Sequence, residues 1–147
     1  MYENKIITEP KWKSWIVQTT TPLFTPEQCR QIIESGRKQP PQQAQVGMNK
    51  PGGGTDTKKR LTTISWIPFK EMEPMYRDLN NFIQKANENH FGFGDIQITE
   101  NAQFTEYPKG GFYDWHMDLD VNGEHEPPVR KISMTCLLSD PSTFKGG

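Results

Sequence analysis

The sequence has few of the features that mark secreted, membrane or nucleic-acid-binding proteins. It contains two cysteines, Cys29 and Cys136, and no Cys-x-x-Cys pair, which excludes a disulfide framework and a cysteine zinc site; both thiols are expected to be small buried hydrophobes. Its 17 Lys+Arg and 18 Asp+Glu give a net charge of −1, so composition provides no attraction to nucleic acid or to an anionic membrane. No run approaches the roughly 20 apolar residues of a membrane span, and residues 1–10 lack a secretion-signal pattern, so we expect a cytoplasmic protein.

The first part of the chain predicts a strand and two helices. Residues 12–21 are rich in β-branched and aromatic side chains and predict the strand. A Thr-x-x-Gln capping box at 25–28, with proline at the first helical position, predicts a helix over 26–37. A second helix is expected from residue 73 or 74 to 89, because its apolar residues recur at helical spacing: Tyr76, Leu79, Phe82, Ile83 and Ala86.

Short strands dominate the remainder of the sequence. Runs bounded by turn residues predict strands at 61–67, 96–99, 102–107, 111–116 and 131–138. Helices followed by clustered strands favour an α+β domain whose two helices pack on one face of a mostly antiparallel sheet. Residues 39–60 have no apolar periodicity and predict a long flexible loop, either a plain excursion or a lid beside a site.

The tripeptide 116–118 contains two side chains that could bind a metal ion. His116 and Asp118 stand two residues apart, and a strand would turn both side chains to the same face. An imidazole nitrogen beside a carboxylate oxygen supplies two of the three ligands in the 2-His-1-carboxylate arrangement that holds non-haem Fe(II). The same pair is also what a solvated strand edge would present.

The surrounding order of motifs resembles the Fe(II)- and 2-oxoglutarate-dependent dioxygenases, in their prolyl 4-hydroxylase-like branch. The resemblance covers most of the chain apart from 39–60. It is carried by FTPEQCRQIIESG at 24–36, YRDLNNFIQKAN at 76–87, QFTEYPKGGFYDWHMDLD at 103–120 and RKISMTCLLSDPSTFKGG at 130–147.

This resemblance implies a double-stranded β-helix (jelly-roll) fold and hydroxylation of a C–H bond, with Fe(II), 2-oxoglutarate as co-substrate and ascorbate as a candidate reductant. The substrate would be a peptide, through a prolyl or similar side chain, or a small molecule. His116 and Asp118 would be the first two iron ligands, and Tyr107 would either donate a hydrogen bond to 2-oxoglutarate or serve as a core tyrosine. Three other residues are less suited as ligands, by spacing or by an expected exposure to solvent: Asp120, His90 and His125.

The family's third ligand, a later histidine followed by Arg or Lys, has no counterpart in this sequence. Residues 1–147 therefore resemble a single, truncated dioxygenase domain. We expect an incomplete record of a longer enzyme; the alternatives are completion by another chain and a non-catalytic remnant. An exposed strand edge at 130–138 would favour a homo-oligomer. The competing function is a jelly-roll binding module without metal-dependent activity.

Overall fold

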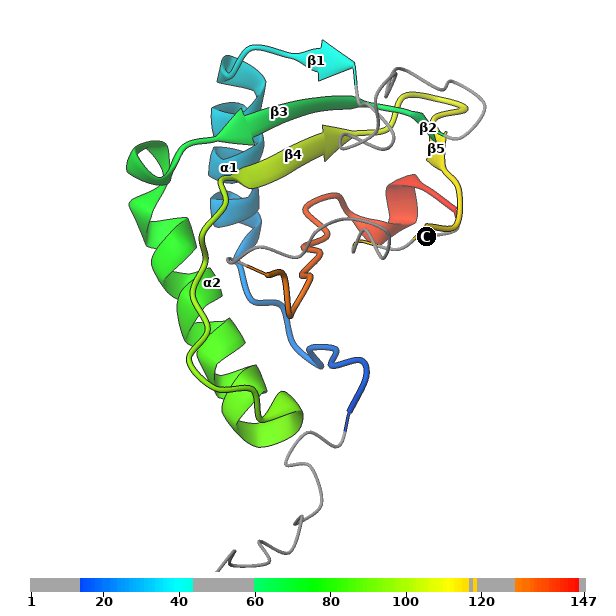
Figure 1. Ribbon diagram of the computed structural model, residues 1–147. Helices are drawn as coiled ribbons and strands as arrows, with labels where there is room; N and C mark the ends of the chain where they lie inside the picture. Colours follow the sequence, from blue (N-terminus) through cyan, green and yellow to red (C-terminus); the bar gives the residue numbers. More distant parts are fainter. Residues whose placement is uncertain (1–13, 44–59, 117, 119–128, 146–147) are drawn as a thin grey trace, which may run out of the picture.

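The computed structural model describes residues 14–43, 60–116, 118 and 129–145, and within them the chain is an α+β protein (Figure 1). Its helical elements are α1 (Pro26–Lys38), η1 (Phe69–Glu71), α2 (Glu73–Ala86), η2 (Asn87–Phe91) and η3 (Pro141–Thr143). Its strands are β1 (Gln42–Gln43), β2 (Arg60–Leu61), β3 (Thr63–Ile67), β4 (Ala102–Glu106) and β5 (Phe112–Tyr113). They form two small antiparallel sheets, ordered β1-β3-β4 and β2-β5, and these described strands do not close a barrel.

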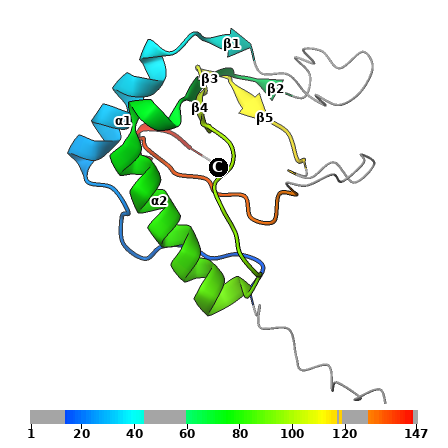
Figure 2. The ribbon, with the colours of Figure 1, turned by 60° about the vertical axis from the view of Figure 1, so that its left-hand side comes forward.

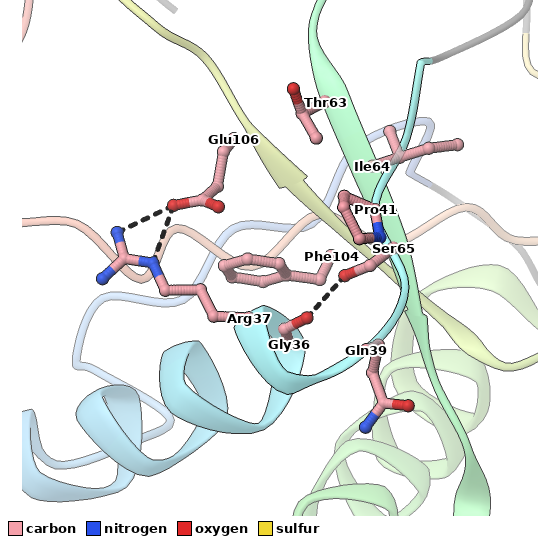
Figure 3. A pocket seen from close by; sticks show the side chains of 9 residues that line it. All are labelled: Gly36, Arg37, Gln39, Pro41, Thr63, Ile64, Ser65, Phe104 and Glu106. Carbon is pink, nitrogen blue, oxygen red and sulfur yellow. Dashed lines mark hydrogen bonds and ion pairs between the residues drawn. The ribbon is translucent and has the colours of Figure 1, made fainter.

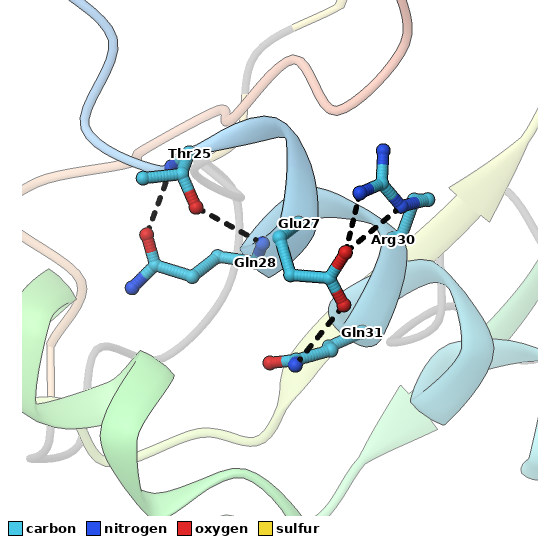
Figure 4. A network of polar contacts seen from close by, with 5 residues as sticks. All are labelled: Thr25, Glu27, Gln28, Arg30 and Gln31. Atoms are coloured by element: carbon cyan, nitrogen blue, oxygen red, sulfur yellow. Dashed lines mark hydrogen bonds and ion pairs between the residues drawn. The ribbon is translucent and has the colours of Figure 1, made fainter.

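Helix α1 begins where the capping box predicted. The Thr25 side chain accepts a hydrogen bond from the Gln28 amide at 3.2 Å, and the Gln28 side chain accepts one from the Thr25 amide at 2.8 Å (Figure 4). Two amides at the start of the helix are thereby satisfied. Arg30 pairs with Glu27 and lowers the pKa of that carboxyl, but both side chains are exposed and the pair adds little stability.

The core lies between α1, the start of α2 and one face of the larger sheet. Ser65 on β3 is paired with Phe104 on β4, so both side chains point to the same face. There the Ser65 hydroxyl donates to the Gly36 carbonyl of α1 at 2.7 Å (Figure 3). A Cβ on Gly36 would clash with the Phe104 ring, so this close approach of helix and sheet requires glycine.

Tyr76 joins α2 to the end of the β3-β4 ladder where Ile67 pairs with Ala102. Its hydroxyl donates to the Ile67 carbonyl of β3 and accepts from the Ala102 amide of β4 at 2.6 Å. Burial raises the pKa of the Tyr76 phenol. The tyrosine belongs to a cluster of buried side chains whose other members are Phe24, Ile32, Ile67, Met75 and Phe104.

The strand predictions hold in the middle of the chain and fail elsewhere. Those for 61–67 and 102–107 are confirmed by β2, β3 and β4, with a break at Thr62. The described part of 12–21, which is 14–21, forms no strand, and neither do 96–99 and 131–138. A segment becomes a strand only when it pairs with a neighbour, and alternation of its side chains does not supply that neighbour. Of 111–116, only Phe112 and Tyr113 pair.

Two other boundaries differ from expectation. Helical structure runs past residue 89, because the π-helical turn η2 continues α2 to Phe91 and ends at Gly92, whose φ of 68° suits glycine. The predicted loop at 39–60 contains β1, which pairs with β3, and the first residue of β2; positions 44–59 lie outside the described residues.

The cysteine prediction is wrong for one of the two thiols. Cys29 is half-buried and packs against the core cluster, whereas Cys136 retains an exposed surface. Desolvation, with a smaller contribution from Cys29, nevertheless raises the pKa of the Cys136 thiol to about 11. This thiol therefore stays protonated and weakly nucleophilic at neutral pH.

The helices of the described residues are short. Helix α2 has 14 residues, whereas a bilayer crossing takes about 20. No helix in the described part of the chain combines the length and the apolar character that such a crossing requires.

Candidate functional site

A glycine turn and the short β2-β5 ladder bring the chain to His116. The Gly111 amide donates to the Pro108 carbonyl at 2.7 Å, and Gly110 has a φ of 79°, which closes the turn after β4. The chain then pairs β5 with β2 in antiparallel register. Figure 2 shows this ladder on the side of the molecule away from α1 and α2. His116 follows three residues after the ladder.

The His116 ring is held by its own segment and by an aromatic neighbour. Its Nδ1 lies 2.8 Å from the Asp114 carbonyl oxygen, which can only accept a hydrogen bond. The ring stacks on Tyr113, with centroids 3.6 Å apart and planes inclined by 14°. The buried Arg60 guanidinium lies 4.3 Å from the centroid of the same tyrosine, so a cation–π contact also holds Tyr113 in place.

The structure places His116 beside Asp118 although neither residue lies in a strand, and we call them the His116–Asp118 pair. The distance from Nε2 of His116 to Oδ1 of Asp118 is 3.1 Å, and the side chains are 37% and 47% exposed. In a neutral imidazole whose Nδ1–H donates a hydrogen bond to the Asp114 backbone carbonyl, Nε2 is an acceptor. The carboxylate oxygen of Asp118 is an acceptor too. Two such atoms side by side can act as neighbouring ligands of one metal ion.

Asp118 is fixed by residues that follow it in the sequence. The Ser133 hydroxyl donates to Oδ2 of Asp118, which leaves Oδ1 for His116. Arg130 donates from Nη1 to the Asp118 carbonyl at 2.8 Å. The Nη2 group of that arginine binds both Glu100 carboxylate oxygens, at 3.0 and 2.8 Å. Both the backbone and the carboxylate of Asp118 are therefore oriented.

Other predicted site residues are not gathered at the His116–Asp118 pair. Tyr107 is 53% exposed, and among the described residues no hydrogen bond joins it to the pair. Its core-tyrosine interpretation is wrong, since half of its surface is accessible. His90 lies exposed in η2, as expected, while Asp120 and His125 lie outside the described residues.

The residues that surround the pair carried little signal in the sequence. Ser133 and Arg130 were visible only as part of the stretch 130–147 that carries the resemblance, and Glu100 and Arg60 were not singled out as site residues. A hydrogen bond to a residue 15 positions away depends on tertiary placement, which the local pattern does not encode.

His116 and Asp118 have no third candidate ligand beside them among the described residues. No group of three or more His, Cys, Asp or Glu side chains suited to a metal occurs in the part of the chain that the structure describes. The His116–Asp118 pair thus matches two positions of a 2-His-1-carboxylate site.

The pocket between α1 and the larger sheet is a separate feature (Figure 3). It has a volume of about 210 Å³, and the exposed Arg37–Glu106 ion pair, 2.7 Å between Nη2 and Oε1, borders it. Neither His116 nor Asp118 lines this pocket, so it supplies no substrate space to the candidate site.

Comparisons with protein-family models, with curated proteins and with solved structures each gave no match for this chain.

Proposed function

We propose that the protein is an Fe(II)- and 2-oxoglutarate-dependent oxygenase with a jelly-roll domain, and that it hydroxylates a C–H bond. The observation that supports this proposal best is the approach of Nε2 of His116 to Oδ1 of Asp118 at 3.1 Å. It agrees with the His-x-Asp motif and with the order of motifs around it.

The spacing of the pair suits two neighbouring ligands of one ion. Ligand atoms about 2.1 Å from a metal and at right angles to each other lie ~3.0 Å apart. The separation of Nε2 and Oδ1 is 3.1 Å. The Nδ1 contact with the Asp114 carbonyl favours the tautomer in which Nε2 has a free lone pair, an arrangement common to metal-binding histidines.

His116 and Asp118 would hold the iron, which when bound supplies the oxidising chemistry with 2-oxoglutarate and oxygen as co-substrates. The contribution of this chain is orientation. Tyr113 and the Asp114 carbonyl set the plane and rotation of the imidazole. Partial exposure of both ligand side chains leaves an approach for a peptide with a prolyl or similar side chain, the substrate that we propose.

A binding module is the second candidate, and exposed aromatic side chains favour it. Trp115 is fully exposed between Asp114 and His116, and Tyr107 and Phe112 are 53% and 40% exposed. Aromatic residues at a surface are typical of recognition sites. In this alternative the His116–Asp118 contact is an imidazolium–carboxylate ion pair and binds no metal.

An anaerobic Fe(II) titration by calorimetry separates the two functions. The oxygenase proposal predicts one saturable site, with a lower dissociation constant when 2-oxoglutarate is present, because the co-substrate adds ligand atoms to the iron. Succinate is expected once oxygen and a hydroxylatable peptide are supplied. If the titration shows no saturable Fe(II) binding, with or without 2-oxoglutarate, the result would support the binding module instead.

A further inference from the structure

Two residues of the segment 129–138 form hydrogen bonds with Asp118, one with its carboxylate and one with its backbone carbonyl. Ser133 binds the carboxylate at Oδ2, while Arg130 binds the backbone carbonyl. Residues 129–138 form no strand, so these contacts do not arise as part of a regular ladder. The Arg130 side chain is itself held by both oxygens of Glu100, which lies two residues before β4.

The hydrogen bond from Ser133 limits the number of carboxylate oxygens that Asp118 can present to a cation. A free carboxylate can turn about its last torsion and present both oxygens to a cation. A hydroxyl that donates to Oδ2 opposes this rotation and leaves Oδ1 toward His116. Arg130 restrains the backbone from moving to compensate, because its guanidinium is bound at both ends.

We propose that Ser133 is a positioning residue of the candidate site, which holds Oδ2 of Asp118 so that a single carboxylate oxygen faces Nε2 of His116. Its role as a determinant of metal affinity rests on the proposed function. Its role in orienting Asp118 does not, because the contacts are made within the chain itself. The two can therefore be tested separately.

The first test uses the metal-free chain. The ¹³C resonance of the Asp118 carboxyl is expected to shift in Ser133→Ala, because its hydrogen-bond donor is lost. It should return toward the original position in Ser133→Thr, which keeps a hydroxyl at the same place. Ser139→Ala provides the matched control, since this exposed serine lies in the same segment. An unchanged Asp118 resonance in Ser133→Ala overturns the proposal.

The second test adds Co(II) as a probe for Fe(II). Loss of a group that orients a ligand typically weakens metal binding by about 10–100-fold, and we expect this range for Ser133→Ala, with a changed visible absorption of the bound Co(II). Ser133→Thr should restore both the affinity and the spectrum, which a change confined to fold stability would not do. Equal affinity and spectra in Ser133→Ala and the original chain would overturn the role in metal affinity. If the original chain binds no Co(II) at a single site while the carboxyl resonance still responds, the proposed function fails and the orienting role of Ser133 is upheld.

Discussion

Replacing Asp118 with alanine is expected to abolish Fe(II)-dependent conversion of 2-oxoglutarate to succinate. The substitution removes one of the two proposed metal ligands and leaves Nε2 of His116 without the oxygen that lies 3.1 Å away. Changes to groups that only orient a ligand cost about 10–100-fold in affinity or activity, so loss of the ligand itself should exceed ~100-fold. Succinate formation and Fe(II) affinity measured on the same samples report the effect.

Asp95→Ala is the matched control for this substitution. Asp95 is exposed, carries the same charge and precedes β4, away from the contacts of Asp118. It should leave Fe(II) binding and turnover unchanged. Undiminished succinate formation by Asp118→Ala would contradict the assignment of Asp118 as a ligand.

Tyr76→Phe is expected to lower the stability of the fold substantially, although it is a conservative substitution. The phenol hydroxyl bridges the Ile67 carbonyl and the Ala102 amide, and phenylalanine keeps the ring while removing both contacts. Leaving a buried polar group without its partner costs about 1–3 kcal/mol, so two such groups predict a loss of about 2–6 kcal/mol in the free energy of unfolding. That is a large part of the roughly 5–15 kcal/mol available to a typical domain. Urea unfolding followed by circular dichroism measures it.

The same tyrosine gives the stability a dependence on alkaline pH. Burial raises the pKa of the folded Tyr76 phenol above the value of about 10 in an unfolded chain. The unfolded chain therefore loses this proton first, and the stability that Tyr76 contributes is present below pH ~10 and falls as the pH rises through the folded pKa. Tyr76→Phe should flatten that decline. Tyr107→Phe, at an exposed tyrosine, should have little effect on either quantity. A stability of Tyr76→Phe equal to that of the original chain would show that the bridge does not hold the strands.

Local signals predicted the elements whose stabilising contacts lie near in sequence. The capping box located the start of α1, since its two hydrogen bonds join Thr25 and Gln28. The prediction for 131–138 failed because alternation indicates which side chains share a face but cannot supply a partner strand.

The site shows the same division between local and tertiary information. The proximity of His116 and Asp118 agrees with their spacing of two residues, although neither lies in one of the strands. The contact of Arg60 with Tyr113 required the β2-β5 register, and that of Ser133 with Asp118 required a return of the chain across 15 residues. The jelly-roll expectation extends beyond the two small sheets of the described residues and remains part of the proposed function.

Whether His116 and Asp118 bind one metal ion can be tested by observing the histidine ring itself. Paramagnetic Co(II), added stepwise while the histidine ring resonances are followed by NMR, is predicted to shift or broaden the His116 signals in a saturable manner. His90, exposed in η2, is the internal reference and should not respond at the same concentrations. A His116 signal that stays unchanged, or that changes only in parallel with His90, would contradict a metal site at this pair.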